Sequence, residues 1–134
     1  TLRLKDHCKL YDPVPIEEIP KFISQCDLAV LPFPPFIGWR VSSPIKLFEY
    51  LAMGKCVVVT EIEAFTDVIG KQPFAFYSSG DKYSDLKQAI KEAYRHREHF
   101  NEYGKLAREY ALKNSTWKIQ AERLVQFFER IKNV

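Results

Sequence analysis

A lysine and a glutamate three residues apart, Lys46 and Glu49, are the residues of this chain best placed to do chemistry. They follow Ser43 and Pro44, a pair typical of a helix start, because a serine hydroxyl can accept from the first amides and proline suits the first helical position. A helix start carries free amides and a partial positive charge, so a lysine there is disfavoured unless an anion binds. The pattern therefore predicts a phosphate site, with Glu49 one turn further along to accept from hydroxyl groups of the same ligand.

The same two charges have a simpler interpretation. Residues three apart lie on adjoining faces of one helical turn, so Lys46 and Glu49 could pair with each other at the surface. The residue types alone leave both interpretations open.

The elements that position these residues are a helix and a strand. The helix is predicted from Pro44 to Met53, and it is apolar almost all the way round, which is typical of a mostly buried helix. Gly54 supplies the left-handed residue that ends the helix. Cys56–Val59 then reads as a short buried strand.

The preceding part of the chain alternates in the same way. Cys8–Tyr11 is predicted to be a strand that ends at the Asp12–Pro13 turn, and a helix is predicted from Pro20 to Gln25, because Pro20 cannot sit in a helix interior. Cys26–Leu31 is predicted as a buried strand. The loop at residues 32–41 follows, and its Trp39 and Arg40 adjoin the predicted phosphate site. Arg40 could pair with a diphosphate oxygen.

After the second buried strand, a short helix is expected within Thr60–Ile69, ended by Gly70, and Phe74–Tyr77 is predicted as a last strand. From Asp81 onward the chain is predicted to be helical, with Asp81 or Ser84 as the first cap and Ser115 or Thr116 as the last. Three apolar stripes are expected to be core: Leu86, Ile90, Ala93 and Tyr94; Phe100, Tyr103, Ala107, Tyr110 and Ala111; and Trp117, Ala121, Leu124, Val125, Phe128 and Ile131.

Strands that alternate with helices predict an α/β fold, a Rossmann-like parallel sheet flanked by helices, here with a helical C-terminal third. Ligands bind such sheets at the carboxyl ends of the strands. The Tyr11–Val14 turn and the loop at residues 32–41 both follow predicted strand ends. The predicted topology and the predicted phosphate site therefore agree.

Composition sets broader limits. The 134 residues are 46% hydrophobic and 28% charged, which is typical of one soluble globular domain. The net charge of +3 is too small to argue for a nucleic-acid partner. Residues 82–134 are the basic part, with 12 Lys and Arg against 7 Asp and Glu. Basic helical faces are usually solvated but can meet anionic lipid headgroups, so a peripheral membrane contact stays open.

The three cysteines, Cys8, Cys26 and Cys56, are odd in number and widely spaced. They have no metal-ligand spacing, and each lies in or beside an apolar segment, where a free cysteine acts as a small hydrophobe. We therefore expect reduced thiols, a cytoplasmic setting and no metal site. No apolar run approaches the ~20 residues that a membrane span needs.

The segment Ser43–Lys55, which reads SPIKLFEYLAMGK, resembles the donor-binding signature of the group 1 (family-4-type) retaining glycosyltransferases of the GT-B fold. In that family the second glutamate of a pair eight residues apart contacts the ribose hydroxyls of a nucleotide sugar, and Glu49 matches it. The resemblance also implies that amides at the helix start, those of Ser43, Ile45 and Lys46, face the diphosphate.

Val41 stands where the resemblance expects the first glutamate, the one that contacts the sugar. A branch of the family that carries Ser-Pro-x-Lys-Leu-Phe-Glu-Tyr manages without it. The loop after an earlier strand lines the nucleobase in the family, which implicates the Tyr11–Val14 turn; an ordinary turn is the alternative. The candidate donor-binding residues are Tyr11, Asp12, Pro13, Val14, Trp39, Arg40, Val41, Ser42, Ser43, Pro44, Ile45, Lys46 and Glu49.

The resemblance covers essentially all of residues 1–134 but only part of such an enzyme. It implies the C-terminal, donor-binding domain of a hexosyltransferase, without its first strand–helix units and without the N-terminal acceptor domain. Such an enzyme transfers the sugar of a UDP-, GDP- or ADP-sugar with retention, without a metal or cofactor, to a saccharide or lipid-linked acceptor, as in polysaccharide biosynthesis. Its location would be the cytoplasm, with the inner face of the membrane left open.

On this interpretation the chain holds no catalytic residue beyond the donor-stabilising Lys46 and Glu49, and alone it should not turn over substrate. Two alternatives to a transferase donor domain stay open. One is a non-catalytic nucleotide-binding or protein-interaction domain, which the replacement at Val41 favours. The other is a sugar-nucleotide epimerase on the same architecture, although the matched motif belongs to transferases.

Overall fold

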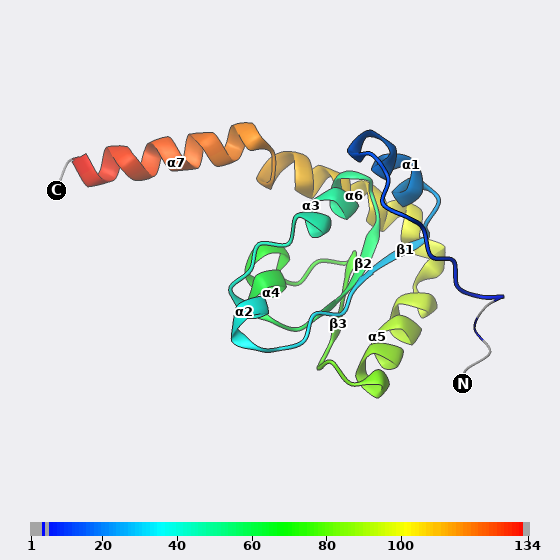
Figure 1. Ribbon diagram of the computed structural model, residues 1–134. Helices are drawn as coiled ribbons and strands as arrows, with labels where there is room; N and C mark the ends of the chain where they lie inside the picture. Colours follow the sequence, from blue (N-terminus) through cyan, green and yellow to red (C-terminus); the bar gives the residue numbers. More distant parts are fainter. Residues whose placement is uncertain (1–3, 5, 133–134) are drawn as a thin grey trace.

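The computed structural model, which describes residue 4 and residues 6–132, has a parallel sheet with helices on both of its faces (Figure 1). Its three strands are β1 (Leu28–Leu31), β2 (Cys56–Thr60) and β3 (Ala75–Ser78), in the order β1-β2-β3. Both strand pairs are parallel, with Ala29 opposite Val57 and Val57 opposite Ala75. The predicted α/β fold class is confirmed.

Helices alternate with the strands and then dominate the C-terminal part of the chain. The first two, the 3-10 helix η1 and helix α1, precede β1, and four, α5, η2, α6 and α7, follow β3. Their bounds are η1 Ile16–Glu18, α1 Ile19–Ser24, α2 Ile37–Arg40, α3 Ile45–Ala52, α4 Glu63–Ile69, α5 Tyr83–Arg95, η2 Arg97–His99, α6 Phe100–Asn114 and α7 Trp117–Lys132.

The core lies on the two sides of the central strand. All five residues of β2 are buried, as expected for a parallel strand that is covered on both faces. Because side chains alternate along a strand, Val57 and Val59 join the cluster built with α3, α4 and α6. Val58 points to the opposite face, where it meets Ala89 and Ala93 of α5.

Two glycines bring α3 close to α6. Gly54 ends α3 with a φ of 67°, which confirms its predicted left-handed conformation. Gly104, inside α6, lies so near that a Cβ added to it would be 2.3 Å from the Gly54 carbonyl oxygen. Arg108 of α6 donates to the Ala52 carbonyl oxygen at the end of α3. The orientation of α3 is therefore set by direct backbone contact with α6.

The strand predicted at Cys8–Tyr11 is wrong. These residues have no strand hydrogen bonds, and Leu10 is 99% exposed. Apolar residues satisfy the pattern of a strand, but a strand needs a partner, and in the described part of the chain β1 pairs only with β2. The Tyr11 ring instead packs edge-on against Phe22 of α1, with 4.9 Å between ring centroids.

Two of the predicted helix caps are also wrong. Pro44, not Ser43, is the N-cap of α3, because its backbone is extended (ψ 107°) and its carbonyl accepts from the Leu47 amide. Lys82 takes the cap position of α5 in place of Asp81 or Ser84. Thr116 is confirmed at the last helix, where its hydroxyl accepts from the Ile119 amide at 3.3 Å.

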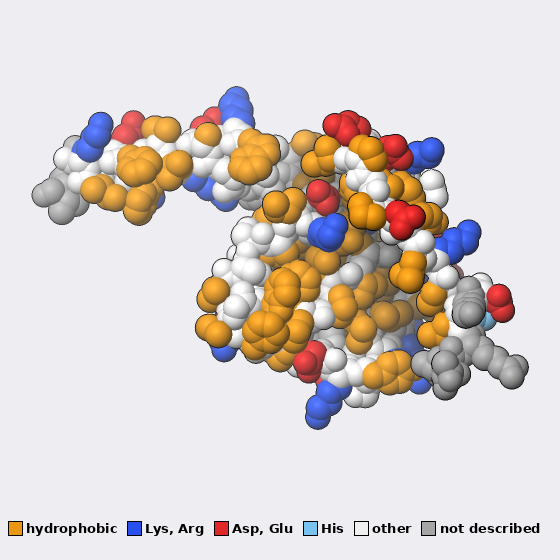
Figure 2. Space-filling view, in the orientation of Figure 1, with side chains coloured by type: hydrophobic (Ala, Val, Ile, Leu, Met, Phe, Trp, Pro, Cys, Tyr) orange, Lys and Arg blue, Asp and Glu red, His pale blue; other side chains and the backbone are white. Residues whose placement is uncertain are grey.

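The apolar stripes have three different outcomes. The second stripe is core, with Ala107 and Ala111 buried. The first is core only in part, since Ala93 is buried and Leu86 is half-buried, whereas Tyr94 is 63% exposed and the buried Ala89 was not among its predicted members. The third was expected to be core and is not. Helix α7 extends away from the sheet, and its hydrophobic side chains lie open along it (Figures 1 and 2).

No helix in the described part of the chain is long and apolar enough to cross a membrane.

Candidate functional site

The start of α3 lies at the edge of the sheet where functional sites of this architecture form. The chain leaves β1 at Leu31, passes through α2 and α3, and enters β2 at Cys56. Because β1 and β2 are parallel, α3 runs back against them, and its first residues lie at the carboxyl ends of the strands. The loop at residues 32–41 and the start of α3 therefore follow a strand end as predicted, whereas the Tyr11–Val14 turn follows no strand in the described part of the chain.

The burial of α3 separates a core face from an open face. Leu47 and Leu51 are fully buried against the sheet and α6. Ile45 and Lys46, at the start of the helix, are exposed, and Glu49 is half-buried. The described residues include no ion pair between Lys46 and Glu49, so the simple surface-pair interpretation is not what the structure contains.

The helix start is also left without a protein partner for its first amides. Pro44 has no side-chain donor or acceptor, and no side-chain cap is present at α3 among the described residues. The first amides of a helix have no acceptor within the helix. Among the described residues the amides of Ile45 and Lys46 have no hydrogen-bond acceptor, so an anion from solution can take that place.

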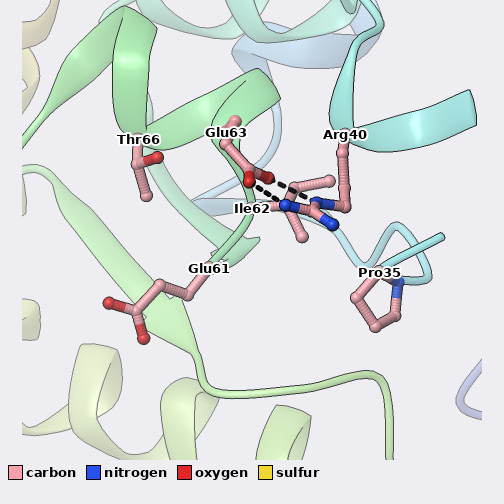
Figure 3. Close-up of a pocket in the computed structure, with 6 residues that line it drawn as sticks. All are labelled: Pro35, Arg40, Glu61, Ile62, Glu63 and Thr66. Carbon is pink, nitrogen blue, oxygen red and sulfur yellow. Dashed lines mark hydrogen bonds and ion pairs between the residues drawn. The ribbon is translucent and has the colours of Figure 1, made fainter. Parts of the chain in front are cut away.

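Arg40, predicted to meet a diphosphate, is engaged elsewhere. Its guanidinium forms a two-pronged ion pair with Glu63 at the start of α4, and the Nε–Oε2 distance is 2.8 Å (Figure 3). The second prong joins Nη2 to Oε1. The hydrogen bonds from Arg40, helped by a backbone hydrogen bond, lower the pKa of Glu63 to about 2. The same hydrogen bonding raises the pKa of Arg40.

A pocket of about 470 Å³ opens beside this ion pair. It lies between α2 and α4, just beyond the carboxyl end of β2, and Figure 3 shows the side chains around it. Its lining residues are Pro35, Arg40, Glu61, Ile62, Glu63 and Thr66. Of the predicted donor-binding residues, only Arg40 is among them.

The acidic residues of this pocket, Glu61 and Glu63, were not among the predicted site residues. A signal was nonetheless present in the sequence. Both lie within three residues of the end of β2, and residues that follow parallel strands gather at one edge of the sheet. Their closeness to Arg40 carries no local signal, because that contact spans 23 residues.

Aromatic packing fixes the helix that carries Arg40. The Trp39 ring lies 4.3 Å from that of Phe33, which in turn lies 5.3 Å from the buried ring of Phe65 in α4. The Ser42 hydroxyl and amide both donate to the Trp39 carbonyl oxygen, at 2.8 and 3.2 Å. Residues 39–42 therefore form a tight turn that rests on the core.

The other candidate residues lie in separate segments, before η1 and at the end of α2. Tyr11, Asp12 and Pro13 are exposed and Val14 is half-buried, in the segment that precedes η1. Val41, in the position expected for the first glutamate, is the C-cap of α2 and is 75% exposed. No carboxylate stands at that position, but the carboxylate of Glu63 lies against its neighbour Arg40.

Comparison with known proteins adds one finding. A family model described as "Glycosyl transferases group 1" matches residues 1–96, which include all three strands and helices α1 to α5. The search of curated proteins found no match, and neither did the search of solved structures. The family match covers well over half of the chain, including the whole α3 segment with Lys46 and Glu49. This chain therefore belongs to the group 1 glycosyl transferases.

Proposed function

We propose that this chain binds the nucleotide-diphosphate sugar for a glycosyltransferase, with the diphosphate at the start of α3. The observation that carries the proposal is the open helix start itself. The uncapped amides of Ile45 and Lys46 and the exposed Lys46 ammonium group lie at the carboxyl edge of a parallel sheet, within the family match. Three positive features at one point suit a doubly charged linker.

Glu49 supplies the second contact of the proposal. It lies one turn after Lys46 on α3 and is half-buried. A carboxylate accepts hydrogen bonds from the paired hydroxyls of a ribose, and such charge-assisted bonds are stronger than neutral ones. On this proposal the nucleobase extends from the ribose toward the Tyr11–Val14 turn.

The chemistry that follows is electrostatic. As the bond between the sugar and the diphosphate breaks, negative charge develops on the leaving diphosphate, and the helix start and Lys46 stabilise it. The donor is a UDP-, GDP- or ADP-sugar, transferred with retention and without a metal to a saccharide or lipid-linked acceptor. The acceptor domain and further strand–helix units belong, on this proposal, to a longer protein, and this chain alone binds the donor without turning it over.

A non-catalytic nucleotide-binding domain is the second candidate. Val41, exposed and apolar where a sugar-binding glutamate is expected, favours it. This candidate shares the binding site but predicts no sugar transfer by the full-length protein, so a transfer assay separates the two.

Replacing Lys46 with alanine should weaken binding of UDP, GDP or ADP, whichever the chain binds best, by about fivefold at low salt. The loss should shrink as salt is added, because Lys46 is exposed and its attraction is screened. Isothermal titration calorimetry at two salt concentrations measures both effects.

Lys71→Ala is the matched control. Lys71 is also exposed but lies between the end of α4 and the start of β3, at the opposite edge of the sheet. Its replacement should leave the affinity unchanged. If the Lys46→Ala and Lys71→Ala variants bind the nucleotide with equal affinity, the start of α3 is not the phosphate site.

A further inference from the structure

We infer that Glu63 competes with the donor's diphosphate for Arg40 and so sets how tightly the site holds a nucleoside diphosphate. This inference rests on the proposed function, since it assumes a diphosphate at the start of α3. It assigns a role to a residue on a different element, α4, 23 residues along the chain from Arg40.

The first step is the geometry of the ion pair. The carboxylate of Glu63 takes the donors Nε and Nη2 of Arg40, the edge of the guanidinium that suits a two-oxygen acceptor. A phosphate group would use the same edge for the same two-pronged contact. Glu63 and a phosphate are therefore alternative partners for one set of donors.

The second step is reach. Arg40 precedes the first residue of α3 by five residues, a separation of at most about 18 Å for a fully extended chain. The two hydrogen bonds from Ser42 to the Trp39 carbonyl fold this segment back, so the true separation is shorter. An arginine side chain and a diphosphate together span much of such a gap. Arg40 is thus the nearest guanidinium along the chain to the proposed diphosphate.

The third step is charge. The pocket beside the ion pair is lined by one cation, Arg40, and two anions, Glu61 and Glu63. Its net charge is therefore negative, which opposes a diphosphate. Because the pKa of Glu63 is lowered to about 2, its carboxylate stays charged at any pH at which the protein would work.

The fourth step is energetic. The side chains of Arg40 and Glu63 are 45% and 46% exposed, so the ion pair is solvated and readily exchanged. A diphosphate with two negative charges can displace it, but part of the binding free energy is used to do so. Glu63 therefore keeps the affinity moderate, which favours release of the nucleoside diphosphate after transfer.

Glu63→Gln tests this role, because glutamine keeps the shape and hydrogen-bonding capacity of the side chain but not the charge. Calorimetric titration with UDP, GDP or ADP should give an affinity about two- to fivefold higher than that of the unmodified chain, the size expected for release of one exposed ion pair. In an Arg40→Gln background, the same replacement should give a smaller increase, because no guanidinium is released.

Glu61→Gln is the matched control, since Glu61 lines the same pocket without a bond to Arg40. It removes the same charge and should raise the affinity less than Glu63→Gln does. Unchanged or weaker binding by Glu63→Gln, with a melting temperature close to that of the unmodified chain, overturns the inference, as does an equal gain from Glu61→Gln.

The same titrations distinguish a failure of the proposed function from a failure of the role of Glu63. If the unmodified chain binds no nucleoside diphosphate, or binds one with no dependence on Lys46, both the proposed site and the role of Glu63 are wrong. If binding depends on Lys46 but not on Glu63, only the role of Glu63 is wrong.

Discussion

Replacing Gly104 with alanine is expected to lower the free energy of unfolding by about 3 kcal/mol, even though alanine is the better helix former. Gly104 lies inside α6, where propensity alone would favour alanine by about 1 kcal/mol. The added Cβ, however, would lie 2.3 Å from the carbonyl oxygen of Gly54. The Cβ is attached directly to the α6 backbone and the Gly54 oxygen is itself a backbone atom, so no change of side-chain rotamer can relieve the clash.

The strain from this replacement should reach the proposed site. Gly54 ends α3 and is separated from the buried strand β2 by Lys55 alone, so Gly54 cannot move without shifting α3 or β2. The α3 helix should then tilt away from α6. Urea unfolding at 25 °C, followed by circular dichroism, gives the stability change.

Gly38→Ala is the control for this experiment. Gly38 lies in the exposed helix α2, and a Cβ added there would meet only the Phe36 ring, at 3.4 and 3.7 Å. The stability change should stay within about 0.5 kcal/mol. A Gly104→Ala variant as stable as the unmodified chain would contradict the close contact between α3 and α6.

Replacing Glu49 with alanine should reduce the affinity for a nucleoside diphosphate by about tenfold or more. Loss of a charge-assisted hydrogen bond costs roughly 1.5–3 kcal/mol, and each 1.4 kcal/mol is about a factor of ten in affinity. Inorganic diphosphate has no ribose, so its affinity should stay the same or rise slightly, because a nearby negative charge is removed. Parallel calorimetric titrations with UDP and inorganic diphosphate measure this difference.

Glu98→Ala gives the comparison for a distant carboxylate. Glu98 is exposed in η2, after the end of α5 and at the amino edge of the sheet. Its loss should change neither affinity. Equal losses for both ligands in Glu49→Ala would mean that Glu49 acts on the helix or the phosphate rather than on the ribose.

Local sequence was sufficient to predict most elements of the fold. The run of β2, Cys56–Thr60, is apolar enough to be a buried strand in any α/β context, and Gly54 marks the end of α3 by its conformational freedom. The strand predicted at Cys8–Tyr11 failed because pairing depends on a partner that the pattern cannot name. The α7 stripe failed in a similar way, because periodicity identifies an apolar face but not what covers it.

In the candidate site, too, local features could be predicted from the sequence and contacts between distant segments could not. Lys46 and Glu49 could be chosen from sequence because a helix start and the turn after it are local features. The Arg40–Glu63 ion pair could not, because it arises where α2 packs against α4. The approach of Gly104 to Gly54 is equally non-local, since neither glycine carries a pattern that points to the other.

The most direct measurement of the central claim is an NMR titration of the isotope-labelled chain with UDP, GDP and ADP, following every backbone amide. If a nucleoside diphosphate binds at the start of α3, the largest shift changes should fall on Ser43 and on the residues from Ile45 to Glu49, which all carry an amide hydrogen, unlike Pro44. Shift changes confined to α5, α6 and α7, or none with any of the three nucleotides, would contradict the claim.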